Sequence, residues 1–212
     1  MAFIKQTLIN DLKKVFSDME SNDDFAKGIA KACKDFGESG TVITADVGAV
    51  SAGAFTGSGN GSLSLSDSLM SSPIIACCES MNNMTEGGDS LLANAIGNGL
   101  LAMTTAGSVE TNVVGTTISP AGSPVPPTSG TAKGKIVCQN ASVISALISC
   151  FQDMKDKAHD DGFDGDKHFA EKIADCVSTY FTSGVITTNG QGALSGTVGS
   201  GTISWPFYLF RL

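Results

Sequence analysis

The sequence has few basic residues and only one arginine. Its 212 residues contain 13 Lys and Arg against 21 Asp and Glu, a formal net charge of −8, and Arg211 is the single Arg. Between residues 35 and 132 there is no Lys or Arg at all. Contacts to nucleic-acid phosphates need clustered positive charge. The sequence therefore predicts no nucleic-acid partner.

Long hydrophobic runs are also missing. No stretch of about 18 consecutive apolar residues occurs, which is the length needed to span a membrane as a helix. Residues 1–6 run directly into an amphipathic pattern, without the basic segment and apolar core of a signal peptide. We therefore expect neither a membrane partner nor a cleaved leader.

Histidine is scarce, and this limits the chemistry that the chain can support. His159 and His168 are the only two, and neither stands in a Ser-His-Asp or Cys-His pattern. The six cysteines include no C-x-x-C pair and lie mostly among small apolar residues, which favours buried free thiols over disulfides or metal ligands. The sequence predicts a protein that is not an enzyme, with no cofactor and no small-molecule substrate.

What the sequence does contain is an internal repeat. Residues 25–48, 92–115 and 169–192 align without gaps, so the unit recurs after 67 and then 77 residues. Five columns are identical in all three copies: Ala26/Ala93/Ala170, Ile29/Ile96/Ile173, Gly40/Gly107/Gly184, Thr44/Thr111/Thr188 and Gly48/Gly115/Gly192. Self-similarity of this kind is the signature of a repeated supersecondary unit. We conclude that the chain is a triplicated module.

In each copy the apolar residues change from helical spacing to the alternating spacing of a strand, and a glycine stands at the change. In the third copy Phe169, Ile173 and Tyr180 fall at helical intervals, whereas residues 186–188 read as a strand. Gly40, Gly107 and Gly184 lie at the change, where a helix commonly ends in a left-handed cap. We expect these three glycines to adopt that conformation.

The repeat predicts an α+β fold of three tandem helix–helix–β-hairpin modules packed together, with the hairpins forming small antiparallel sheets. The expected modules are residues 1–66, residues 67–138 with a longer Pro-containing hairpin, and residues 139–204 with an acidic interhelical loop; an aromatic arm, residues 205–212, follows. About 70 residues are too few to bury a core alone, so the modules must pack together. The 25 glycines are expected in tight hairpins and close backbone contacts, because no P-loop motif is present.

The acidic interhelical loop of the third module partly matches an EF-hand. Asp160, Asp164 and Glu171 occupy the first, fifth and twelfth positions of that pattern, but Gly162 stands where a ligand is expected. These three carboxylates are the candidate metal ligands, and no metal site is firmly assigned. The other interpretation is a solvated loop that caps the next helix.

The C-terminal segment is unusually aromatic. Its candidate interaction residues are Trp205, Phe207, Tyr208 and Phe210. Aromatic side chains are enriched at the energetic centres of protein interfaces, which favours a docking arm. A terminal strand that folds over its own core would have the same composition, so both interpretations stay open.

The repeat resembles a known kind of protein. Its signature, Phe169-Ala170…Ile173-Ala174…Gly184-Val185-Ile186-Thr187-Thr188 followed by a Gly-rich arm, is similar to repeats in virion structural proteins of large tailed bacteriophages. The resemblance covers most of the chain and implies a capsid-decoration, neck or tail component. It also implies that the partners are copies of the chain or other virion proteins, and that the protein is assembled into the virion in the host cytoplasm.

The leading functional hypothesis is therefore a non-enzymatic structural protein. It would bind neighbouring subunits through its hairpin arms and its aromatic C-terminus. The alternatives are a calcium- or ligand-binding module centred on residues 160–171, and a surface adhesin whose exposed Thr/Gly arms form the binding tips.

Overall fold

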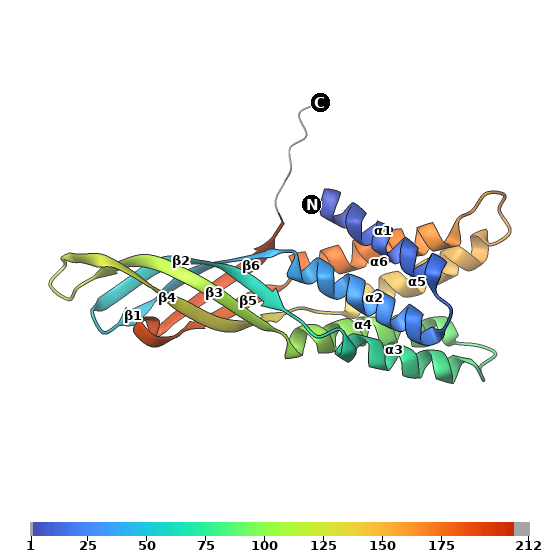
Figure 1. Ribbon diagram of the computed structural model, residues 1–212, viewed down its shortest axis with the longest axis horizontal. Coiled ribbons are helices and arrows are strands. Elements are labelled where there is room, and N and C mark those ends of the chain that lie inside the picture. Colours follow the sequence, from blue (N-terminus) through green and yellow to red (C-terminus); the bar gives the residue numbers. More distant parts are fainter. Residues whose placement is uncertain (1, 206–212) are drawn as a thin grey trace, which may run out of the picture.

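The computed structural model of the chain describes residues 2–205 and shows an elongated molecule with a helical half and a β-barrel half (Figure 1). Helices and strands follow in the order helix–helix–strand–strand, three times. Their bounds are α1 Ala2–Asp18, α2 Asn22–Glu38, β1 Thr41–Val50, β2 Gly53–Ser64, α3 Ser68–Met81, α4 Gly88–Ala106, β3 Ser108–Ile118, β4 Pro124–Val137, α5 Ala141–Lys157, α6 Gly165–Thr182, β5 Val185–Gly190 and β6 Thr197–Ser204. A short 3₁₀ turn, Gly192–Leu194, connects the last two strands.

The six helices pack side by side in a closed ring. Each helix contacts the two that are adjacent to it in chain order, and α6 returns to contact α1. The apolar stripe of each helix faces inward, so residues such as Leu12, Ile29, Leu100 and Ile173 are almost completely buried. Aromatic contacts such as the stacking of Phe16 on Phe169 join α1 to α6 and so close the ring. No described helix is long and apolar enough to cross a membrane.

The six strands form one closed antiparallel barrel in the order β1-β2-β3-β4-β5-β6, with β6 paired to β1. The prediction of three modules with small separate sheets is therefore wrong. Three separate hairpins would leave six strand edges unpaired, and an exposed edge readily pairs with another strand. Pairing each hairpin with the next removes most of these edges, although residues 124–131 of β4 have no partner on β5. It also makes the strands a single structural unit shared by all three repeats.

The threonine column of the repeat meets glycines of the neighbouring modules at the seams between modules. Thr44, Thr111 and Thr188 point into the barrel and are buried, and their partners across the three seams are Gly201, Gly61 and Gly134 respectively. A Cβ at any of these glycines would lie far inside 3.0 Å of a carbonyl oxygen on the neighbouring strand. The strands therefore curl together only because glycine stands at these positions.

The glycines that follow the conserved helices have a different role from the one expected. None of Gly40, Gly107 and Gly184 is among the glycines with a positive φ, so the prediction of left-handed caps is wrong. Each instead makes room for a side chain at the junction of helices and barrel: a Cβ would meet Ile203 at Gly40, Leu65 at Gly107 and Ile136 at Gly184. Glycine is required at these positions because the two halves pack closely, and not because the backbone needs a positive φ.

Candidate functional site

The outer surface of β1 is the most unusual feature of the barrel. Along β1 the outward positions are Ile43, Ala45, Val47 and Ala49, whereas the inward positions include Thr44 and Asp46. Ile43 is 49% exposed and Val47 is 56% exposed. Antiparallel strands with one face in water normally place polar residues outward. The pattern on β1 is therefore reversed.

The apolar surface continues onto the neighbouring strands. Val198 on β6 is paired with Val47, Ala54 on β2 is paired with Ala49, and Ile118 on β3 is paired with Ala54. Val198 and Ile118 are each exposed over more than half of their surface. We call the seven residues together the β1 face: Ile43, Ala45, Val47, Ala49, Ala54, Ile118 and Val198. Cross-strand neighbours lie side by side on a sheet, so this is a contiguous surface.

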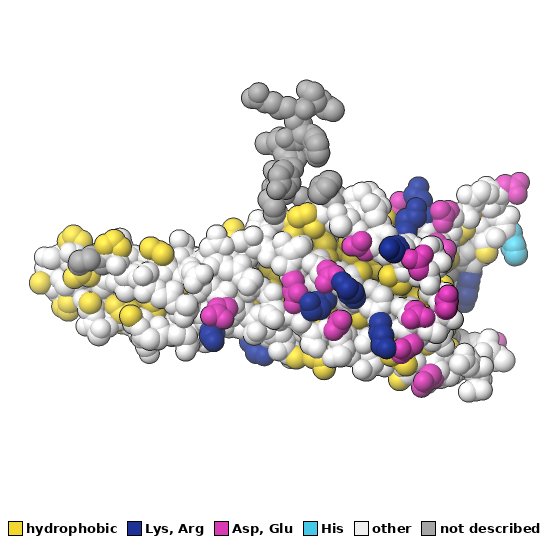
Figure 2. Space-filling view, in the orientation of Figure 1, with side chains coloured by type: hydrophobic (Ala, Val, Ile, Leu, Met, Phe, Trp, Pro, Cys, Tyr) yellow, Lys and Arg dark blue, Asp and Glu magenta, His cyan; other side chains and the backbone are white. Residues whose placement is uncertain are grey.

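Charge is segregated between the two halves of the molecule. The six strands contain only Asp46, which is buried, together with Glu110, Lys133 and Lys135, so their net charge is zero. The whole formal charge of −8 therefore belongs to the rest of the chain. Figure 2 shows the charged side chains gathered over the helices and a surface nearly free of charge along the barrel. The barrel surface can meet another protein without removing charges from water.

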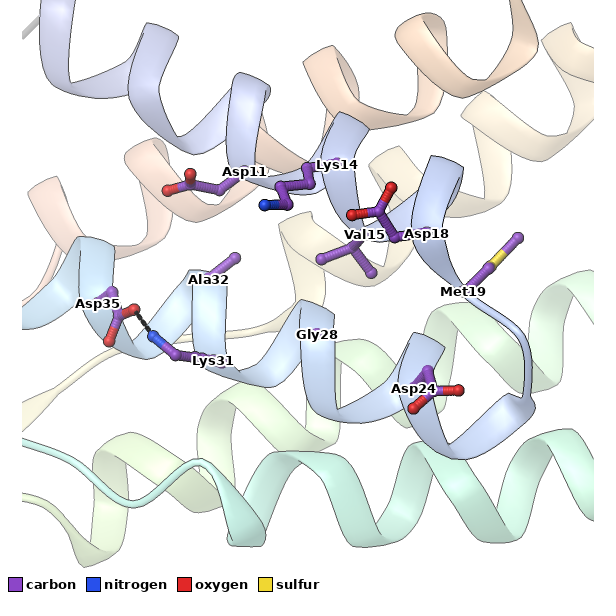
Figure 3. Close-up of a pocket in the computed structure, with 10 residues that line it drawn as sticks. All are labelled: Asp11, Lys14, Val15, Asp18, Met19, Asp24, Gly28, Lys31, Ala32 and Asp35. Carbon is purple, nitrogen blue, oxygen red and sulfur yellow. Dashed lines mark hydrogen bonds and ion pairs between the residues drawn. The ribbon is translucent and has the colours of Figure 1, made fainter.

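A groove of about 490 Å³ lies between α1 and α2 (Figure 3). At the floor of the groove Gly28 lets the two helices approach closely, since a Cβ on Gly28 would lie well inside 3.0 Å of the Val15 side chain. Its charged lining consists of four aspartates and two lysines, and Lys31 is held by Asp35 one helical turn away. These residues form the polar faces of two surface helices, and the lining contains no histidine, cysteine or hydroxyl nucleophile.

The acidic loop is placed between α5 and α6, and its candidate ligands do not converge. Asp164 caps α6 by accepting a hydrogen bond from the backbone N–H of Lys167 at 2.9 Å. Glu171 lies within α6, where Lys167 is 3.9 Å away. Across residues 2–205, no group of three or more His, Cys, Asp and Glu side chains is arranged to hold a metal ion. Asp164 thus has the capping role that was the alternative to calcium binding.

Trp205, expected in the C-terminal arm, is a core residue in the structure. It is 2% exposed, and its ring stacks on Phe36 with ring centroids 5.0 Å apart. Its indole Nε1–H points to the carbonyl oxygen of Phe36 at 3.4 Å and to Ser39 Oγ at 3.3 Å. Phe207, Tyr208 and Phe210 lie outside the described residues. Trp205 therefore extends the chain's own core at the junction of α2 and the barrel.

The reactive side chains of the core are protected by burial. All six cysteines are free thiols, and burial raises the pKa of the Cys33 thiol to about 12 and those of Cys138 and Cys176 to about 11. Burial also raises the pKa of Tyr180, whose hydroxyl is 2.6 Å from Thr104 Oγ1. Thiols with raised pKa values carry little thiolate near neutral pH and are poor nucleophiles. These groups stabilise the helical core rather than supply a reaction centre.

The β1 face was missed by the sequence analysis, although residues 42–47 carry its signal. In that segment Thr44 and Asp46 alternate with Ile43, Ala45 and Val47, which indicates a strand with two chemically different faces, but the spacing does not say which face points outward. Comparison with protein-family models, with curated proteins and with solved structures found no match.

Proposed function

We propose that this chain is a non-enzymatic structural subunit that associates with copies of itself through the β1 face. The observation that carries the proposal is the reversed pattern of β1, which exposes branched apolar side chains and buries a carboxylate. Contiguous exposed apolar surface on a folded protein is typical of interaction sites. The repeat's resemblance to bacteriophage virion proteins supports a place for this subunit in such a particle.

The closed barrel determines how association would occur. The sequence suggested hairpin arms as the binding elements, but β1, which carries most of the β1 face, is paired with β2 on one side and β6 on the other, so a partner cannot be added to β1 by strand pairing. The remaining mode is packing of one sheet face on another, as in a sandwich of two sheets. The small and branched side chains of the β1 face are suited to such packing.

A second copy is the occupant that the charge distribution favours. The β1 face carries no charge, so a complementary surface must also be apolar and uncharged, and the face itself has these properties. A twofold contact needs only one self-complementary patch. The surplus negative charge lies outside the strands, so two copies can meet through their barrels without bringing that charge into the interface.

The test is the oligomeric state of the full chain, measured by sedimentation equilibrium over a range of protein concentrations. We expect the unaltered chain to associate and Val47→Glu to raise the dissociation constant at least about a hundredfold, because an unpaired carboxylate would be buried in the contact. Ser129→Glu is the matched control, because β4 lies three strands from β1 in either direction and Ser129 is exposed. It should associate like the unaltered chain.

At a protein concentration low enough for the unaltered chain to be monomeric, both variants should melt at the same temperature as that chain, since each changes an exposed side chain. A chain that stays monomeric at every concentration would refute self-association, and a Val47→Glu variant that associates normally would refute the β1 face as the interface. The virion context has its own test, mass spectrometry of purified phage particles, in which peptides of this chain should be found. Their absence would remove that context without affecting self-association.

A further inference from the structure

The interior of the barrel contains a carboxylate with no charged partner among the described residues. Asp46 is fully buried, and none of the described ion pairs includes it. Thr44 Oγ1 donates to Asp46 Oδ2 at 2.6 Å, and Thr188 Oγ1 is 3.4 Å from Asp46 Oδ1. Burying an ionised carboxylate without a compensating charge is costly, so such groups are usually paired, protonated or bound to a metal ion.

A third hydroxyl at this level has no partner among residues 2–205. Thr111 Oγ1 is fully buried and makes no hydrogen bond with any of them. Its position is shown by Gly59, where a Cβ would lie 3.1 Å from both Thr111 Oγ1 and Asp46 Oδ2, and closer still to Thr44 Oγ1. A buried hydroxyl without a partner is costly, and in native proteins an ordered water or a bound ion can satisfy such a group.

The oxygens come together from all three repeats. Thr44, Thr111 and Thr188 are the same column of the repeat, on β1, β3 and β5. On the other side of the carboxylate, a Cβ at Gly199 would crowd both Asp46 Oδ1 and Thr188 Oγ1. Gly59 and Gly199 thus leave room for the oxygens of the carboxylate and the hydroxyls.

The repeat itself shows that the acid is special to one module. The positions equivalent to Asp46 are Val113 in the second module and Gly190 in the third, so the ring of three hydroxyls is accompanied by a single negative charge. Oxygen-only ligands suit hard cations, but calcium sites use several carboxylates. One carboxylate and three neutral hydroxyls balance a cation of charge +1.

We propose that the barrel interior binds one monovalent cation of about the size of sodium, held by Asp46 and the hydroxyls of Thr44, Thr111 and Thr188. Each hydroxyl oxygen keeps lone pairs for the cation even when its hydrogen is donated elsewhere. The ion neutralises Asp46 and gives Thr111 Oγ1 a partner. Because the ligands belong to three modules, the site is complete only in the closed barrel, and binding stabilises closure.

The test compares thermal unfolding of the full chain in sodium chloride and in tetramethylammonium chloride at equal ionic strength. A ligand that binds only the folded state raises the melting temperature, and the rise grows with its concentration. We expect a melting temperature at least about 3 °C higher in sodium. Equal melting temperatures in the two salts would overturn the proposal.

Two variants localise the effect. Asp46→Val copies the residue that the second module has at this position, and it should fold and melt at the same temperature in both salts. Thr111→Val removes the unpaired hydroxyl while keeping the shape of the side chain. It should lose most of the sodium effect without melting lower in tetramethylammonium.

Thr111→Val also keeps the proposal testable if Asp46→Val does not fold. A sodium effect that persists undiminished in Thr111→Val would place the ion elsewhere and refute the site. Val113→Ile, a change at an inward position without a ligand oxygen, is the control for a general disturbance of the barrel. It should keep the full sodium effect.

Discussion

Replacing Gly201 by alanine tests the closure of the barrel directly. Gly201 on β6 is paired with Thr44 on β1, across the seam that joins the last module to the first. A Cβ at this position would lie far inside 3.0 Å of the carbonyl oxygen of Ile43. Because that oxygen belongs to the backbone of a paired strand, it cannot turn away as a side chain would.

The expected cost follows from the need to separate the two strands. Overpacking a core usually costs about 1–3 kcal/mol. Here the strands must also move apart where they are paired, which weakens hydrogen bonds worth about 1 kcal/mol each. We therefore expect Gly201→Ala to lower the free energy of unfolding by about 3 kcal/mol or more. For a chain of this size that corresponds to a melting temperature roughly 6–12 °C lower.

The assay is urea unfolding followed by circular dichroism, with matched variants at the other seams. Gly61→Ala and Gly134→Ala meet the backbone carbonyls of Glu110 and Thr187 in the same way, so they should be destabilised similarly. Gly165→Ala is the opposite control, since a Cβ there has only ordinary contacts at 3.6 Å or more and the residue begins a helix.

Alanine at Gly165 should be neutral or stabilise by up to about 1 kcal/mol. Three separate hairpins would not bring Gly201 near Ile43 at all. A Gly201→Ala variant as stable as the unaltered chain would therefore refute the closed barrel.

Two further predictions concern the core. Trp205→Ala should lower the free energy of unfolding by about 3–5 kcal/mol in urea titrations, because it removes the ring stacked on Phe36. Trp205→Phe keeps a ring and should lower the free energy of unfolding much less. Equal losses in the two variants would contradict the stacking argument. Burial raises the pKa of the Cys33 thiol from 9.0 to about 12, so the stabilisation that this thiol provides is complete below pH 9 and is lost as the pH rises toward 12. Cys33→Ala should flatten the fall of unfolding free energy above pH 9 by about 1.4 kcal/mol per pH unit, and an unchanged slope would show that the thiol is not buried.

Local features of the fold followed from local sequence patterns. The helical spacing of Phe169, Ile173 and Tyr180 predicted a helix, and in α6 these residues are buried. Ile186 and Thr188 are likewise the buried residues of β5, as alternation predicts. Such patterns are readable because a helix or strand with one buried face repeats its apolar residues at its own period.

The pairing between modules did not follow from the sequence. A hairpin is specified by a short connection, but the pairing of β6 with β1 joins residues 149 to 163 positions apart, and no local pattern encodes it. The same holds for Trp205, whose composition suited either an interface or a core. Only its place beside Phe36 distinguishes the two.

For the candidate sites too, the sequence determined some features and the tertiary structure determined the others. Sequence alone determined that the chain is acidic, poor in arginine and built from three repeats with shared threonine and glycine columns, because composition and self-similarity need no coordinates. Only the tertiary structure decided that those threonines meet around Asp46 and that Ile43 and Val47 face outward. Strand alternation defines two faces, and closure of the barrel decides which of them is inside.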